Sequence, residues 1–141
     1  MKVMLAHGVL GFGAIDLAGQ HVRYFKGVVD DLSNLGVEIE APSLGPIDPV
    51  RERAAKLAAA INSFFSPTDR GHVIAHSMGG LDAQFALAHL DGVAQRVRSL
   101  VTIGTPYFGS PIADLLSASH ALHAAVGIEP AVLRELEGSI A

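Results

Sequence analysis

Residues 75–80 of this 141-residue chain read Ala-His-Ser-Met-Gly-Gly, and they are the stretch that decides the fold. An apolar run at residues 72–75 comes before the serine and predicts a short buried strand. Residues 81–88 come after it and predict a helix. Ser77 is therefore expected at a sharp turn between a strand and a helix, with a small residue two positions to either side.

Such a turn is typical of a nucleophile elbow, in which a strand and a helix present a serine hydroxyl. The usual pattern is G-x-S-x-G, and Ala75 stands at its first position here. Alanine keeps that side chain small, so we interpret the stretch as a tolerated variant. A helix that begins directly after Ser77 would place free N–H groups and the positive end of its dipole beside the serine oxygen. These residue types are common, however, so the motif alone does not establish a function.

The composition predicts one globular domain with a substantial core. Half of the residues are apolar and 17% are charged, which is not the composition of a disordered chain. The net charge is −4 and no basic cluster is present, which argues against a nucleic-acid partner. No apolar run reaches the roughly 18 residues of a transmembrane helix. With no cysteine, the chain has neither a disulfide nor a thiolate metal site.

The first residues show no signal-peptide pattern, because Met1 and Lys2 lead directly into an apolar strand. Localisation stays open between a cytoplasmic protein and a secreted protein whose sequence starts after processing.

Strands and helices are expected to alternate along the chain. The predicted strands are residues 3–6, 37–42, 72–75 and, within the stretch 97–103, residues 99–103; the predicted helices are residues 22–35, 51–65, 81–88, 112–123 and 130–136. Regular alternation indicates crossover connections and a mostly parallel sheet with helices on both faces.

Apolar residues recur at helical spacing in the first three predicted helices. In the first helix these are Tyr24, Phe25, Val28, Val29 and Leu32; in the second they are Ala54, Leu57, Ala58, Ile61 and Phe65, which are expected to point inward; in the third, Leu81, Phe85 and Ala88 are expected on one face.

Three unusual loops follow three of the predicted strands. They begin at His7-Gly8, at Ser77 and at Gly104-Thr105-Pro106. Ligand sites in parallel sheets lie at the carboxyl ends of strands, so we expect these loops to meet at one edge of the sheet.

With these segments in place, the chain resembles the bacterial triacylglycerol lipases of the α/β-hydrolase fold. The resemblance rests on residues 7–12 (His-Gly-Val-Leu-Gly-Phe), 24–28 (Tyr-Phe-Lys-Gly-Val), 74–80 and 103–110. The four segments come in the family's order at about its spacing and cover nearly the whole chain.

The resemblance implies a carboxylic ester hydrolase in which Ser77 attacks the ester carbonyl and forms an acyl-enzyme. The resulting negative oxygen needs preorganised donors, which would be the backbone N–H groups of Met78 and Val9. Gly8 and Gly11 would then let the loop backbone approach the site closely. His7 is expected to orient this loop through hydrogen bonds.

A serine nucleophile also needs a histidine base and an acid, which in this fold follow the serine in the order acid, then histidine. The family's positions for both lie beyond Ala141. The remaining acids after Ser77 are Asp82, Asp91, Asp114, Glu129, Glu135 and Glu137, and the remaining histidines are His89, His120 and His123. We expect Asp82 and His89 to face solvent. Asp114 precedes His120 and His123 in the correct order, but all three fall in a predicted lid helix. His76 is expected to point away from the serine oxygen.

The expected architecture is a single partial α/β-hydrolase domain over residues 1–141, truncated after the strand that ends near Ile103, with residues 107–141 as a lid or helical region. The chain could be the amino-terminal part of a lipase, a piece completed by another chain, or a shortened enzyme with a rearranged base. An open sheet edge would favour self-association.

Two other hypotheses compete with an ester or lipid hydrolase. A non-catalytic protein of this fold, or one that needs a second chain, fits the lack of an evident base and acid. Dinucleotide binding fails, because the third glycine of G-x-G-x-x-G would fall at Asp16. No cofactor or metal site is predicted; the resemblance implies a structural calcium whose ligands would lie beyond this sequence.

Overall fold

The computed structural model describes residues 1–9, 14–17, 20–46 and 48–111. Its elements in chain order are β1 (Lys2–Ala6), β2 (Ala14–Leu17), β3 (Gln20–Arg23), α1 (Val28–Asn34), β4 (Glu38–Glu40), α2 (Val50–Phe64), β5 (Gly71–His76), α3 (Gly79–His89), α4 (Val93–Arg96) and β6 (Val97–Ile103). The two predicted helices beyond residue 111 lie outside the described residues.

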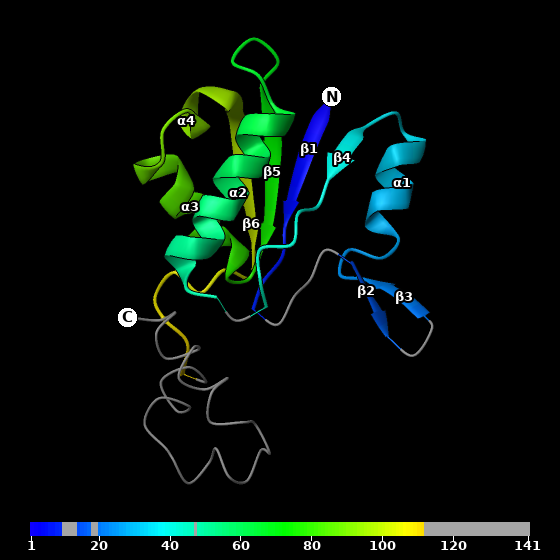
Figure 1. Cartoon of the computed structure of the whole chain (residues 1–141), viewed down its shortest axis with the longest axis horizontal. Coiled ribbons are helices and arrows are strands. Elements are labelled where there is room, and N and C mark those ends of the chain that lie inside the picture. The colour runs from blue at the N-terminus through cyan, green and yellow to red at the C-terminus, as the bar shows by residue number, and fades with distance from the viewer. Residues whose placement is uncertain (10–13, 18–19, 47, 112–141) are drawn as a thin grey trace, which may run out of the picture.

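The centre of the molecule is a four-stranded sheet in the order β4-β1-β5-β6 (Figure 1). All three neighbouring pairs are parallel, and Leu5 pairs with Ile74 at the centre of the sheet. The predicted parallel sheet is thus confirmed. Because its strands run the same way, the carboxyl ends of β1, β5 and β6 lie at one edge.

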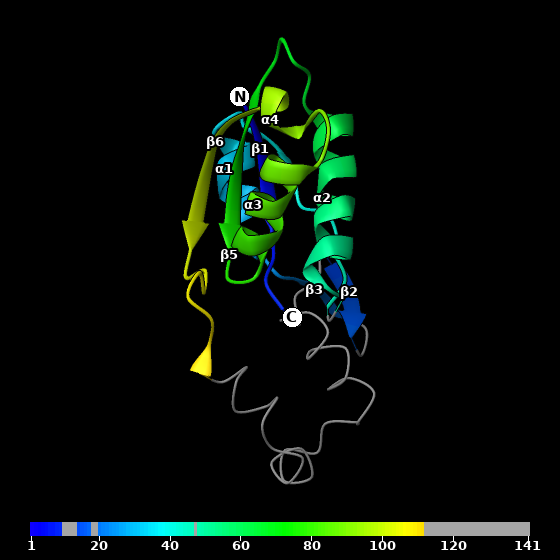
Figure 2. The ribbon, with the colours of Figure 1, turned by 90° about the vertical axis from the view of Figure 1, so that its left-hand side faces the viewer.

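Helices cover both faces of this sheet, as predicted (Figure 2). Alternate residues of β1 point to opposite sides, with Met4 and Ala6 in one core cluster and Val3 and Leu5 in the other. The first cluster lies against α2 and α3, and the second is completed by apolar residues of α1 and its flanks. Strands that are buried on both faces need an almost unbroken apolar sequence, which explains the run in β1.

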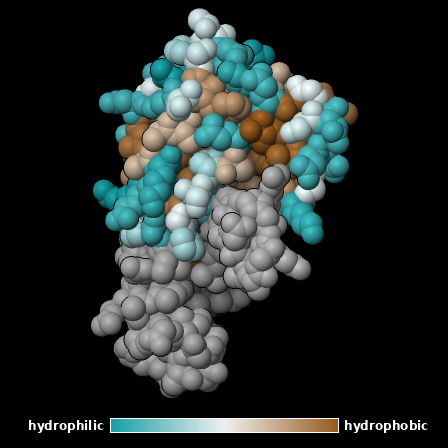
Figure 3. Space-filling view, turned by 45° about the vertical axis from the view of Figure 1, so that its right-hand side comes forward, coloured by the Kyte–Doolittle hydropathy of each residue, from teal (hydrophilic) through white to brown (hydrophobic). Residues whose placement is uncertain are grey.

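Apolar side chains also reach the surface. Figure 3 shows them gathered in one area of the visible face, bordered by hydrophilic residues.

Strand β6 is an edge of the sheet within the described chain, and Val101 and Ile103 are about half exposed there. Self-association through this edge stays a prediction. No helix within the described ranges is long and apolar enough to cross a membrane.

The prediction of one helix over residues 22–35 is wrong. Residues 20–23 instead form β3, which pairs antiparallel with β2, and the helix begins only at Val28. Gly27 precedes it with a φ of 84°, a backbone conformation outside the helical region. The apolar residues of this stretch recur at helical spacing even though a strand and a turn precede the helix, so the spacing predicted a helix that is too long. Similarly, β4 is shorter than the predicted strand over residues 37–42.

The apolar face predicted for the elbow helix packs only in part against the core. In α3 the buried side chains include Asp82, Ala83 and Ala86, whereas Ala88 is exposed and Phe85 is half-buried. Small residues on this face allow α3 to lie close to α2. Asp82, which was expected in solvent, is fully buried.

Leu57 of α2 has no exposed surface and belongs to the larger core cluster. Replacing it with alanine should lower the free energy of unfolding by about 2–5 kcal/mol, since the change leaves a cavity in the core. Leu35 is 78% exposed, so Leu35→Ala is the matched control and should change stability by less than about 0.5 kcal/mol. Urea denaturation of both variants measures the difference. Equal losses would contradict this assignment of the core.

Candidate active site

Ser77 lies between the end of β5 and the start of α3, with a φ of 55°. It is the only non-glycine residue with a positive φ in the described part of the chain. This conformation costs an L-residue roughly 1–3 kcal/mol and persists only where neighbouring contacts hold it. The sharp turn predicted from the sequence is therefore present at this serine, and its backbone is strained.

The end of β6 holds the backbone of Ser77 on both sides of the residue. The Ser77 N–H donates to the Ile103 carbonyl at 2.8 Å. The Ser77 carbonyl accepts from the Thr105 hydroxyl at 2.9 Å and from the Gly80 N–H at 3.0 Å. The loop after β6 is thus in direct contact with the elbow, as the placement of the three loops predicted.

The loop after β1 approaches the serine from the other side. A Cβ placed on Gly8 would lie 2.7 Å from the Ser77 Cβ and 3.1 Å from its Oγ. Only a glycine backbone can come so near, which accounts for Gly8. Val9 is the next residue, and its side chain is 37% exposed. Gly11 lies outside the described residues.

The two expected oxyanion donors directly follow Ser77 and Gly8 in the chain. Met78 directly follows the serine, and its side chain is buried. Within the described residues, neither the Met78 N–H nor the Val9 N–H takes part in the backbone hydrogen bonds of turns, loops and caps. Their role in binding an oxyanion stays a prediction.

His7 is fully buried and bonded through both ring nitrogens. Its Nε2 accepts from the Leu44 N–H at 2.9 Å, so Nδ1 carries the proton and donates to the Gly8 carbonyl at 2.9 Å. Burial lowers the pKa of His7, and the nearby Arg53 lowers it further. A neutral ring with both nitrogens engaged is suited to orienting the loop and not to accepting a proton from Ser77.

His76 forms a separate contact with Tyr24. The Tyr24 hydroxyl and the His76 Nδ1 are 2.7 Å apart, and the tyrosine ring centroid lies 5.7 Å from that of His7 and 5.8 Å from that of His76. Tyr24 thus connects the segment before α1 to the residue before the serine.

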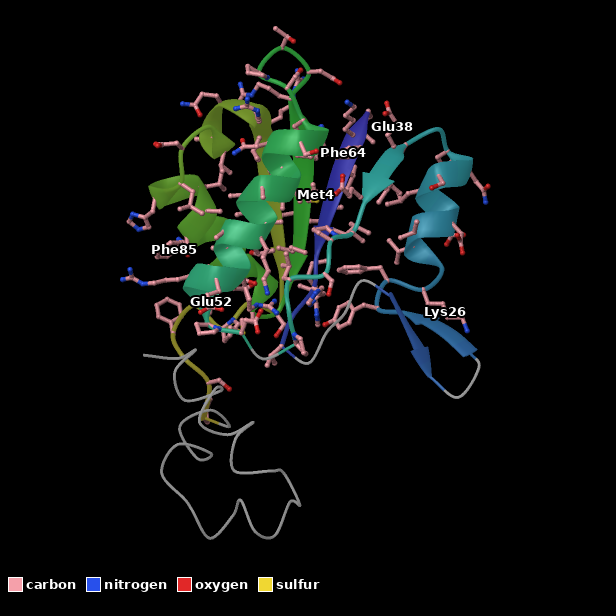
Figure 4. All side chains as sticks on the ribbon, viewed as in Figure 1. Met4, Lys26, Glu38, Glu52, Phe64 and Phe85 are labelled. Carbon is pink, nitrogen blue, oxygen red and sulfur yellow. The ribbon has the colours of Figure 1, made fainter. Side chains whose placement is uncertain are left out.

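Arg53 was not predicted to belong to the site, yet it links the elements around it. It is fully buried in α2, and its Nε and Nη2 bind the Asp82 Oδ2 at 2.9 and 2.8 Å. Its Nη2 also donates to the His7 carbonyl at 2.7 Å, and its Nη1 donates to the Gly45 carbonyl. Figure 4 shows Glu52, the preceding residue, at the end of α2 that lies near the carboxyl ends of the strands.

A signal for this ion pair was present in the sequence. Arg53 adjoins Ala54 and lies one turn before Leu57, so a charged residue sits on the apolar face of α2. Buried charges need partners, and that rule points to a carboxylate on a neighbouring element.

The remaining candidates for acid and base are not brought to Ser77 in the described chain. Asp82 is engaged by Arg53, Asp91 is exposed, and the exposed His89 packs its ring on Phe85. Within the described ranges, the histidine hydrogen bonds include none to the Ser77 hydroxyl. The other candidates, Asp114, Glu129, Glu135, Glu137, His120 and His123, lie outside the described residues, as does most of the expected lid at 107–141.

No metal site is formed by the described part of the chain, where no group of three or more His, Asp or Glu residues comes together. The resemblance to the lipases implies a structural calcium, but its ligands are expected beyond this sequence.

Comparison with protein families matches residues 51–126 to the PGAP1-like alpha/beta domain. A triacylglycerol lipase of Pseudarthrobacter phenanthrenivorans is 31% identical over 119 residues, which are 81% of this chain and 35% of that protein. A triacylglycerol lipase of Burkholderia plantarii is 31% identical over 119 residues, covering 81% of this chain and 32% of the lipase. The chain spans about a third of the length of the curated relatives that it matches.

Solved structures share the fold. A Bacillus licheniformis lipase in mature form matches with a TM-score of 0.72 at 23% identity, over 99% of this chain and 55% of that one. A metagenomic carboxyl esterase matches with a TM-score of 0.71 at 18% identity, over 99% of this chain and 43% of that one. The described architecture is therefore part of an α/β-hydrolase fold.

Burial raises the pKa of Asp82 from 3.8 to about 6, against the opposing effect of Arg53. Its Oδ1 has no hydrogen-bond partner within the described residues, which fits the poor solvation of the charged form. Between these two pKa values the folded state binds more protons than the unfolded state. Stability therefore falls as the pH rises from about 4 to about 6, by roughly 3 kcal/mol from this residue.

The variant Asp82→Asn has no carboxyl group to titrate at this position. Its free energy of unfolding should therefore not show the fall between about pH 4 and pH 6. Urea unfolding of both proteins at several pH values between 4 and 7 gives the difference in free energy. If the free energies of unfolding of the two proteins change with pH in parallel, the pKa of Asp82 is not raised. The same conclusion follows if the wild type gains stability relative to the variant as the pH rises.

Proposed function

The chain belongs to the PGAP1-like alpha/beta domain family, and on this premise we propose that it is a serine-dependent carboxylic ester hydrolase of the lipase type, acting through an acyl-enzyme on Ser77. The observation that carries the proposal is the strained backbone of Ser77 at the carboxyl edge of the sheet, with the Gly8 backbone against its side chain. Relatives named triacylglycerol lipase support an ester of a fatty acid as the substrate.

In the proposed reaction the Ser77 oxygen attacks the ester carbonyl carbon. The new C–O bond forms as the carbonyl π electrons move to the oxygen, and the alcohol then leaves with a proton. Water hydrolyses the acyl-serine in a second attack and restores the hydroxyl. The base that takes and returns the protons is assigned to a histidine outside the described residues.

The negative oxygen of the intermediate is assigned to the N–H groups of Met78 and Val9. They come from two loops that the Gly8–Ser77 approach brings together. Oxyanion donors act best when they are fixed before the reaction begins. The loop after β1 is held by hydrogen bonds of this kind: His7 binds the Gly8 carbonyl and the Leu44 N–H, and Arg53 binds the His7 carbonyl. These bonds support a fixed position of the Val9 N–H.

Exposed apolar side chains follow two of the strands that end at this edge, which would suit an acyl chain. Val9 follows β1, and Tyr107 and Phe108 follow β6; all three side chains are exposed by more than a third. Exposed apolar groups at a site are typical of one that takes an apolar ligand.

A second candidate is a ligand-binding protein of this fold, or a hydrolase that needs another chain. It is favoured by the lack of a histidine hydrogen bond to Ser77 within the described residues.

Labelling with a fluorophosphonate separates the two candidates. The wild type should be labelled, because the probe reacts only with an activated serine. Ser63→Ala changes an exposed serine of α2 and should be labelled equally, whereas Ser77→Ala should not be labelled. A folded wild type that fails to react supports the second candidate, and labelling that persists in Ser77→Ala refutes the role of Ser77.

The variant Gly8→Ala tests the approach of the two loops. Its methyl group would lie 2.7 Å from the Ser77 Cβ, so the loop or the serine must move. The labelling rate should fall at least about tenfold, since a shift of the donors or the nucleophile by a few tenths of an ångström disrupts the site.

Gly36→Ala is the control for Gly8→Ala. Gly36 has a positive φ and open space around it, at the opposite end of the sheet. This variant should lose stability and keep the wild-type labelling rate. Equal rates in Gly8→Ala and the wild type would contradict the placement of the oxyanion loop.

A further inference from the structure

We propose that Thr105 is a positioning residue that fixes the Ser77–Met78 peptide through its hydroxyl group. The inference rests on the proposed function, which assigns the N–H of this peptide to the oxyanion. Neither the motif nor the predicted oxyanion loop includes Thr105, which belongs to the loop after β6.

The contact is to the carbonyl of the peptide in question. The Thr105 Oγ1 donates to the Ser77 carbonyl at 2.9 Å. In a planar trans peptide the carbonyl and the following N–H point in opposite directions. A hydroxyl that holds the Ser77 carbonyl therefore also sets the direction of the Met78 N–H.

The Thr105 side chain packs closely against the backbone of Gly80. A Cβ on Gly80 would overlap the Thr105 hydroxyl and lie 2.7 Å from its Cγ2. Gly80, in the first turn of α3, thus has no side chain where the Thr105 side chain packs against the helix. This close approach gives Gly80 a physical role that a simple small-residue motif does not explain.

The peptide needs such a restraint because Ser77 has a left-handed backbone. Its N–H is held by the Ile103 carbonyl at 2.8 Å, which fixes the side towards β5. On the other side, the Ser77 carbonyl is held by the Gly80 N–H and by Thr105. Removing the hydroxyl leaves the Gly80 N–H as the one donor to the Ser77 carbonyl among the described hydrogen bonds, so this side of the strained residue is held less firmly.

Two hydrogen bonds to the same carbonyl also act on the N–H beyond it. They draw electron density towards the oxygen and make the N–H of that peptide a stronger donor. Thr105 is therefore assigned both the direction and the strength of the donor, without contact to the substrate.

The test compares Thr105→Val, which has nearly the same shape without the hydroxyl, with Thr105→Ser, which keeps it. In the full chain, Thr105→Val should slow labelling of Ser77 by about tenfold or more, the scale of a weakened oxyanion donor. Thr105→Ser should stay within about threefold of the wild type, since its hydroxyl can make the same bond. With a soluble ester, Thr105→Val should lower kcat and leave KM nearly unchanged.

A second readout does not depend on reactivity. Hydrogen exchange of the peptide spanning residues 77–80 should be faster in Thr105→Val than in the wild type and Thr105→Ser. Thermal unfolding identifies a variant that fails to fold, in which case Thr105→Ala replaces Thr105→Val. Equal labelling or equal exchange in Thr105→Val and the wild type overturns the proposal, as do equal defects in the valine and serine variants.

The outcomes also separate this inference from the proposed function. If the folded wild type is not labelled, the proposed function fails, and the exchange of residues 77–80 still decides whether Thr105 restrains the peptide. If the wild type is labelled and the valine variant reacts equally well, the function stands and the role of Thr105 is wrong.

Discussion

The structure depends on one strained residue at the carboxyl edge of a parallel sheet. Ser77 follows β5 and takes a left-handed backbone that an L-residue avoids, and contacts from the ends of two neighbouring strands hold it there. Ile103 and Thr105 bind its backbone from the end of β6, and Gly8 lies against its side chain from the end of β1. The parallel register of β1, β5 and β6 makes these contacts possible, because it brings the three ends to one edge.

Behind this edge, a single buried cation connects the parts that must keep their positions. Arg53 binds Asp82 in the elbow helix, the His7 carbonyl in the loop after β1 and the Gly45 carbonyl before α2. A guanidinium group can serve several acceptors at once because its donors form a rigid planar array. Burying such a pair is costly, so its presence here is better explained by the need to fix the loop than by stability.

Much of this could be predicted from the sequence, and the exceptions have physical causes. The apolar runs of β1 and β5 and the spacing along α2 gave the correct elements, because each pattern is local and strong. The pairing of β2 with β3 was missed because backbone hydrogen bonds between separate segments leave little trace in apolar spacing. The burial of Asp82 was missed because its partner lies 29 positions away in the chain. The acid and histidine of the proposed reaction fall outside the described residues, so the structure adds nothing to their prediction.

We propose that the loops after β1 and β5 form an oxyanion site beside Ser77. A crystal structure of the protein after reaction with a phosphonate ester would show whether they do. We expect a covalent bond from the Ser77 oxygen to phosphorus, with one phosphonate oxygen about 2.7–3.1 Å from the backbone nitrogens of both Met78 and Val9. A phosphonate oxygen that points into solvent, or one bound by other groups, would show that these loops do not form the oxyanion site.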